Sequence, residues 1–300
     1  MRARTGPAAL ALVGVTAVWG STFTVIKDAV AAMPVADFLA VRFAVAAAAL
    51  LLLFGRQAAR LGTAQRRQGL LLGACYGGGQ VLQTLGLHRT PASVTGSLTG
   101  MYVVLTPLLG ALLLRHRVPA STWFAGTLAT GGLATLALHG FSVGAGGLLV
   151  LASTVAYALH ILGLGAWSTS QSALGMAVWQ MVAITGVCTL TALPGGITLP
   201  ADLAGWGAIG YTAVGGAAIA LLVQTWAQAQ LPATRAAVIM TMEPVFAALF
   251  AVLLAGERLG LRTIAGGLLV LAAMLLVELA PRRTGTAAEH PPAEALHHEP

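Results

Sequence analysis

Apolar segments of about the length of a membrane-spanning helix follow one another along almost the whole chain. A helix needs roughly 20 mostly apolar residues to cross a bilayer, and ten segments meet this condition. Their approximate limits are 7–26, 38–54, 69–87, 93–114, 122–138, 146–164, 173–193, 203–227, 233–255 and 263–279. Only 8% of the residues are charged, against about 25% in soluble domains. We therefore predict an all-α membrane protein with ten transmembrane helices.

The positions of Lys and Arg predict how these helices are oriented, because cytoplasmic loops carry an excess of basic residues. With the N-terminus in the cytoplasm, eleven of the 16 Lys and Arg residues lie on that side and four on the other, while Arg42 lies within a span. Both termini are therefore expected in the cytoplasm, and the helices in the cytoplasmic (inner) membrane. The net charge of +7 comes from these short clusters, so no nucleic-acid partner is predicted.

The two halves of the chain are similar in sequence. Shifted by 141 residues, PASVTGSLTGMYVVLTPLLGALLLRHRV from Pro91 aligns without a gap with PATRAAVIMTMEPVFAALFAVLLAGERL from Pro232. Five spans per half is an odd number, so the second half would cross the membrane in the opposite sense. Inverted repeats of this kind are typical of secondary transporters, whose substrate site lies near the midplane between the repeats. We predict one five-helix repeat over 1–140, a second over 141–280, and a disordered cytoplasmic tail over 281–300.

Short motifs in both halves carry a family resemblance. They are WGSTFTVIK from Trp19, FLAVRF from Phe38, QTLGL from Gln83, TGMYVVLTPLL from Thr99, AYALHIL from Ala156 and QTWAQAQLPATRAAVIMTMEPVFAALFAVLLAGERL from Gln224. Together they resemble the EamA-type, ten-span branch of the drug/metabolite transporter superfamily, over roughly residues 7–279. One departure is the RHR that ends the fourth span, where relatives often have an acidic residue. The resemblance implies a secondary active transporter, expected as an exporter of small metabolites such as amino acids or related solutes, working by alternating access.

Glu243 stands about ten residues into its predicted span and is followed at once by Pro244. At 1.5 Å per residue this position is close to the middle of the membrane, where a carboxyl group costs about 2.5–3.5 kcal/mol. We predict that Glu243 faces the transport pathway, where it exchanges a proton or contacts the solute. Pro244 and Pro107 are predicted bending points, because proline removes a backbone N–H donor. The alternative is a structural carboxyl that is hydrogen-bonded within the bundle.

Further polar side chains lie inside the predicted spans and often share one helix face. Arg42 is expected either to bind an anionic group of the solute or to extend to the outer headgroups. His160 is expected either to relay protons or to tie two helices together. The other predicted pathway residues are Trp19, Thr22, Gln80, Gln83, Thr99, Tyr102, Tyr157, Gln180, Gln224 and Gln228. These residues predict a central cavity lined by the first, third, fourth, sixth, eighth and ninth spans.

Other classes of protein leave different signatures. GFSVG at Gly140–Gly144 matches the G-x-S-x-G pattern of serine hydrolases, but it stands in a connection between spans rather than in a strand–turn–helix setting. The sequence contains no H-E-x-x-H motif, P-loop or acidic metal cluster, so we predict no catalytic residue, metal or cofactor. The expected partners are a small-molecule solute, protons and the lipid bilayer. A non-transporting scaffold remains the alternative, in which the polar faces would pack against neighbouring helices without a cavity.

Overall fold

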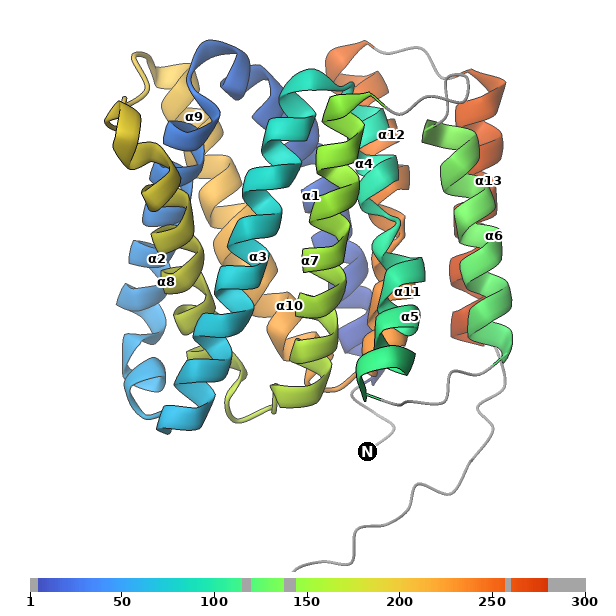
Figure 1. Cartoon of the computed structure of the whole chain (residues 1–300), viewed down its shortest axis with the longest axis horizontal. Helices are drawn as coiled ribbons and strands as arrows, with labels where there is room; N and C mark the ends of the chain where they lie inside the picture. Colours follow the sequence, from blue (N-terminus) through green and yellow to red (C-terminus); the bar gives the residue numbers. More distant parts are fainter. Residues whose placement is uncertain (1–4, 115–119, 138–143, 257–259, 280–300) are drawn as a thin grey trace, which may run out of the picture.

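The computed structural model describes residues 5–114, 120–137, 144–256 and 260–279, and within these ranges every regular element is a helix (Figure 1). The first half contains α1 (Thr5–Ala32), α2 (Val35–Ala59), α3 (Thr63–Arg89), α4 (Ala92–Thr99), α5 (Tyr102–Leu114) and α6 (Ala120–Ala137). The second half contains α7 (Ala145–Trp167), α8 (Ala173–Ala192), η2 (Leu193–Gly195), α9 (Leu203–Tyr211), η3 (Thr212–Ile219), α10 (Ala220–Gln228), α11 (Ala233–Met240), α12 (Met242–Ala255) and α13 (Leu261–Leu279). The predicted tail and most of the GFSVG motif lie outside the described residues.

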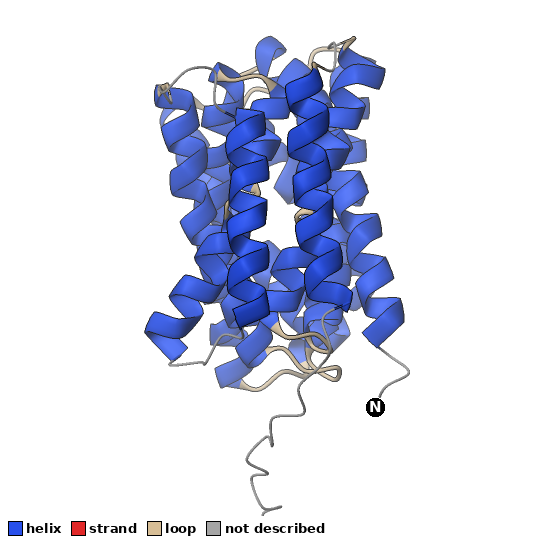
Figure 2. Cartoon of the chain, turned by 90° about the vertical axis from the view of Figure 1, so that its right-hand side faces the viewer, coloured by secondary structure: helices blue, strands red, loops and turns tan. Residues whose placement is uncertain are grey.

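The helices stand side by side in an upright bundle (Figure 2). Seven helical stretches of the described chain are long and apolar enough to cross a membrane. The other three predicted spans are also helical, as α3, α6 and α13, and α3 is much less apolar than its neighbours. Leucines such as Leu52 and Leu261, which are 87% and 88% exposed, cover the outside of the bundle. The protein is therefore an all-helical, multi-pass membrane protein.

Two of the predicted spans are interrupted near their middle. The span that begins at Ala92 changes from α4 to α5 at Gly100 and Met101, and the span that begins at Ala233 changes from α11 to α12 at Thr241. These two breaks are related by the same shift of 141 residues that aligns the two halves. Pro244 stands three residues after the second break, whereas Pro107 lies within the unbroken helix α5.

A π-helical segment, η3, joins α9 to α10 within one span. At Gly216 of this segment a Cβ atom would lie only 2.9 Å from the methyl carbon of Thr22 and 3.5 Å from Nη2 of Arg42. The segment therefore approaches α1 and α2 as closely as glycine allows. Short π-helical segments are frequent at functional sites.

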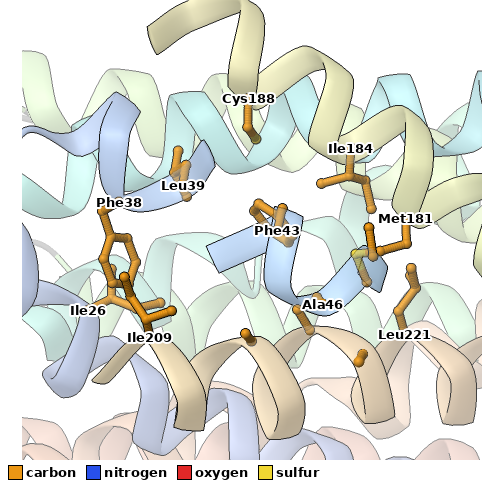
Figure 3. Packing of buried hydrophobic residues seen from close by; sticks show 14 of the residues in the cluster. Ile26, Phe38, Leu39, Phe43, Ala46, Met181, Ile184, Cys188, Ile209 and Leu221 are labelled. Atoms are coloured by element: carbon orange, nitrogen blue, oxygen red, sulfur yellow. The ribbon is translucent and has the colours of Figure 1, made fainter. Parts of the chain in front are cut away.

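The two halves are interleaved rather than juxtaposed. α3 packs against both α7 and α8, α2 packs against α8, and α1 packs against α12. A large apolar cluster fills the space where α2 meets α8 and the α9–α10 span (Figure 3). In it Phe38 and Phe43 of α2 lie among Met181, Ile184 and Ile209, all nearly inaccessible to solvent. This cluster makes a rigid wall beside the polar centre of the bundle.

Candidate functional site

A polar pocket lies between helices of both halves. Its lining comes from α1, α2, α3, α4, α5, α7, α10, α11 and α12, and it consists of Trp19, Thr22, Phe23, Ile26, Arg42, Tyr76, Gln80, Gln83, Thr84, Leu87, Thr99, Tyr102, Tyr157, His160, Ile161, Gln224, Met240 and Glu243. Of the predicted pathway residues, Gln180 and Gln228 are outside this lining. The free volume is about 40 Å³, enough for about three water molecules. The space within the pocket is therefore too small for a metabolite.

Arg42 brings a buried positive charge to the pocket. The side chain is only 3% exposed. Its Nε donates to the carbonyl oxygen of Thr212 at 3.2 Å and its Nη1 to Oε1 of Gln80 at 3.3 Å, while the guanidinium lies 4.8 Å from the ring centre of Phe43. Among the described residues no carboxylate lies within ion-pair distance of Arg42. Since a guanidinium carries five N–H donors, it retains donors for an anionic group.

Two glutamines of α3 organise one side of the pocket. Nε2 of Gln80 donates to the hydroxyl of Tyr157 at 2.8 Å, and that hydroxyl donates to Oε1 of Gln83 at 2.9 Å. Nε2 of Gln83 in turn donates to the hydroxyl of Thr99 at 2.9 Å. The chain of bonds runs from Arg42 across α3 to α7 and α4. Such a connected network fixes side-chain positions because each buried polar group needs its partner.

Tyr102 of α5 and Glu243 of α12 contact each other in the pocket. The hydroxyl of Tyr102 donates to the carbonyl oxygen of Met240 at 2.6 Å and lies 3.3 Å from Oε2 of Glu243. Glu243 is 5% exposed, and it is the only carboxyl-bearing side chain in the pocket lining. The pocket thus holds a fixed cation on α2 and a carboxyl group on α12.

His160 forms a hydrogen bond with Gln180, which lies outside the pocket lining. Nε2 of His160 lies 2.7 Å from Oε1 of Gln180, whose Nε2 donates to the hydroxyl of Thr225 at 3.2 Å. On the pocket side, the ring of Tyr76 stands 4.9 Å from the imidazole, centre to centre. The predicted residue Gln180 therefore holds a pocket residue without lining the pocket itself.

Gln224 has an unused acceptor. Its Nε2 donates to Oε1 of Gln228 at 3.0 Å, and Nε2 of Gln228 donates to the carbonyl oxygen of Ile161 at 2.9 Å. Because the Ile161 carbonyl only accepts, this chain fixes the orientation of both amides. Oε1 of Gln224 has no partner among the described residues, and an unmet buried acceptor costs about 1–3 kcal/mol. Gln228 ties α10 to α7, outside the pocket lining.

Trp19 and Thr22 connect α1 to the π-helical segment. The indole Nε1 of Trp19 donates to the carbonyl oxygen of Gly216 at 2.9 Å. The hydroxyl of Thr22 donates back to the carbonyl oxygen of Trp19 at 2.8 Å. With the bond from Arg42 to Thr212, two carbonyl groups of η3 accept side-chain donors from α1 and α2. The π-helical segment is therefore held at its first residue and near its middle by residues of the pocket.

Several lining residues were not predicted because they are apolar. Phe23, Ile26, Leu87 and Ile161 each stand four residues after a predicted site residue, in the same helix. Residues at i and i+4 share a helix face. Extending each predicted polar position by one helical turn would have found these four.

Comparisons with known proteins agree with this architecture. The model of the EamA-like transporter family matches twice, over residues 6–138 and 144–279. An uncharacterized transporter of Archaeoglobus fulgidus is 30% identical over 277 residues, which cover 90% of this chain and 85% of the relative. A crystal structure of another protein superposes with a TM-score of 0.74, at 16% identity, over 94% of this chain and 99% of that one; this likeness concerns the fold alone. The protein is a membrane transporter rather than an enzyme, and the chain belongs to the EamA-like transporter family.

Proposed function

We propose that this protein is a secondary active carrier that exports small metabolites, such as amino acids or related solutes, across the cytoplasmic membrane by alternating access. The observation that carries the proposal is the buried polar pocket between the halves, with a guanidinium that forms an ion pair with no carboxylate of the described residues. Buried polar groups are costly in a membrane, and a protein that only serves as a scaffold would gain nothing that offsets this cost. The narrow pocket must widen before a solute enters, and rocking of the halves provides that change.

The proposed architecture has ten transmembrane helices in two inverted five-helix repeats, over 1–140 and 141–280. Three observations support it. The family model matches each half separately, the interruptions at Gly100 and Thr241 are equivalent under the shift of 141 residues, and so are Gln83 and Gln224, which both line the pocket. We place both termini in the cytoplasm on the distribution of Lys and Arg.

Arg42 is the proposed contact for an anionic group of the solute. A guanidinium binds a carboxylate or phosphate through two parallel N–H donors. The Gln80 amide beside it is neutral and offers the solute a further hydrogen-bonding group. The predicted alternative, an arginine that extends to the outer headgroups, fits poorly with a side chain that is 3% exposed and bonded to η3. Solutes with one acidic group are therefore the first class to test.

The direct test is a screen for solutes that stabilise the purified protein against heat, using amino acids, nucleosides and cationic dyes. A bound ligand raises the melting temperature as its concentration exceeds Kd. Solutes that stabilise the protein are then loaded into proteoliposomes, and their transport is measured. We expect at least one solute both to stabilise the protein and to be transported by it. In Arg42→Ala the same solute should no longer raise the melting temperature. Proteoliposomes that move none of the stabilising solutes would leave the scaffold as the better description.

Glu243 is the proposed proton-binding group. A carboxyl in the pocket lining that contacts a residue of the other half can exchange a proton with the pathway as the halves move. Glu243→Gln keeps the shape and the acceptor for Tyr102 but cannot ionise. We expect transport by this variant to lose its dependence on the proton gradient. Asp37→Asn is the matched control, because Asp37 is a buried carboxylate outside the pocket that accepts from the Thr198 amide at 3.1 Å. Unchanged proton dependence in Glu243→Gln would remove Glu243 from the coupling role.

A second cavity gives the proposed route to the outer side. It has a volume of about 590 Å³ and lies between the C-terminal end of α1, the start of α2 and the segment 198–211. With the N-terminus in the cytoplasm, this end of α1 is the outer one. Ser21 of α1 and Tyr211 of the cavity lining are joined by a hydrogen bond of 2.5 Å. We propose that this cavity is an outer vestibule, separated from the pocket by α1 in the closed state.

A further inference from the structure

Tyr102 and Glu243 occupy equivalent positions in the two halves. They are 141 residues apart, and each lies in the first turn of the helix that follows the interruption of its span. Both side chains point into the pocket, where they contact each other. The two interruptions are therefore connected by a pair of side chains that the repeat itself makes equivalent.

The bond from Tyr102 replaces one that the second half lacks. In a continuous helix the carbonyl of Met240 would accept from the backbone N–H of residue 244, but that residue is proline and has no N–H. The hydroxyl of Tyr102 donates to this carbonyl at 2.6 Å. In the first half the residue equivalent to Pro244 is Val103, whose N–H donates to the carbonyl oxygen of Gly100 at 3.1 Å, while the equivalent of Met240 is Thr99. The hydroxyl of Tyr102 therefore takes the place of the backbone donor that Pro244 lacks.

We propose that Tyr102 is a positioning residue that keeps the pocket narrow, because its hydroxyl replaces the N–H donor that Pro244 lacks and joins the two helix interruptions. This rests on the carrier function proposed above. Tyr102, Met240 and Glu243 all line the pocket, so the bond lies in the wall of the space that a solute must occupy. When the pocket opens, the bond breaks, and water or a donor group of the solute satisfies the Met240 carbonyl.

The test measures how often the pocket opens in the absence of any solute. A cysteine is introduced by Met240→Cys, and its alkylation by N-ethylmaleimide is followed by mass spectrometry on the purified full-length protein. Tyr102→Phe removes only the hydroxyl. Loss of one hydrogen bond is expected to raise the alkylation rate at position 240 about fivefold. Tyr76→Phe is the matched control, since Tyr76 lines the same pocket and has ring contacts with Tyr157 and His160.

Native Cys188 reports whether the variant is merely less stable. It is completely buried in the apolar cluster of α2 and α8, so it reacts only when the protein unfolds. A rise at position 240 with no change at Cys188, and none in Tyr76→Phe, supports the proposal. An unchanged rate at position 240, or an equal rise at Cys188, overturns it.

Pro244→Ala provides a second, independent test. It restores the backbone N–H that Met240 lacks, so the Tyr102 hydroxyl becomes redundant. We expect Tyr102→Phe to have less than a twofold effect on alkylation in this background, and an undiminished fivefold effect would overturn the proposal. Since both tests are made without solute, they decide the role of Tyr102 whatever the proteoliposomes show. Absence of transport would count against the carrier function alone.

Discussion

Gly73 is the glycine at which an added methyl group should destabilise the helix packing most. A Cβ atom there would lie 2.2 Å from the carbonyl oxygen of Gln180 and 2.7 Å from its Cα, whereas real Cβ contacts are not shorter than 3.0 Å. The obstacle is helix backbone, which cannot rotate aside. In Gly73→Ala, α8 must therefore move away from α3 by at least 0.8 Å, the difference between 3.0 and 2.2 Å.

Gly78, on the same helix, is the matched control, because nothing lies within 4 Å of the place its Cβ would take. Replacing an interior helical glycine by alanine gains about 1 kcal/mol from helix propensity. Gly78→Ala should therefore stabilise the protein by about 0.5–1 kcal/mol. Gly73→Ala receives the same gain but loses about 1–3 kcal/mol to overpacking, with the upper end expected for a backbone obstacle. The two variants should differ by roughly 2–3 kcal/mol.

The assay is thermal unfolding in detergent micelles, followed by the fluorescence of the six tryptophans. At about 2–4 °C per kcal/mol, Gly73→Ala should melt on the order of 5 °C or more below Gly78→Ala. The shift of α8 should also weaken the bond of 2.7 Å between Gln180 and His160, and with it the wall of the pocket. Equal melting temperatures for the two variants would refute the close contact between α3 and α8.

Three further changes test other contacts. Gly216→Ala should reduce transport several-fold with little loss of thermal stability, because the new methyl group meets the Thr22 side chain, at 2.9 Å, rather than backbone. A variant that unfolds instead would contradict this. Gln180→Leu leaves Nε2 of His160 without its partner and should lower the free energy of unfolding by about 1–3 kcal/mol, measured by the same melts. Asp37→Ala removes the acceptor for an amide in the loop before α9, and hydrogen exchange of that loop should become faster; an unchanged rate would show that the bond does not hold the loop.

The helical nature of the chain could be predicted because long apolar runs leave few alternatives. In lipid only helices or closed barrels satisfy the backbone, and each of the ten predicted segments is largely helical over the residues that the structure describes. The interruptions could not be located in the same way. Pro244 drew attention to the break at Thr241, but the equivalent break at Gly100 stands seven residues before Pro107, which lies in unbroken helix.

The polar pocket could be predicted in outline for a similar reason. Amides and charges are expensive in hydrocarbon, so those within spans gather where they can pair. Gln180 shows the limit of this argument, because a polar residue inside the bundle can face the pocket or support a residue that does. The π-helical segment at Gly216 was not predicted at all. Its sequence is a run of small residues with no signal for the extra residue in the turn, and the bonds from Trp19 and Arg42 arise only once three helices have met.

The polar face of α3 has a consequence for how the protein is made. This helix carries Tyr76, Gln80 and Gln83 and is not among those apolar enough to cross a membrane by composition. The helices that cover it, α7 and α8, belong to the second half and are synthesised later. After α3 has been synthesised, its polar face therefore has no partner helices until α7 and α8 have also been made. The first half expressed alone should therefore be recognised by quality-control proteases, and co-expression of the second half should rescue it.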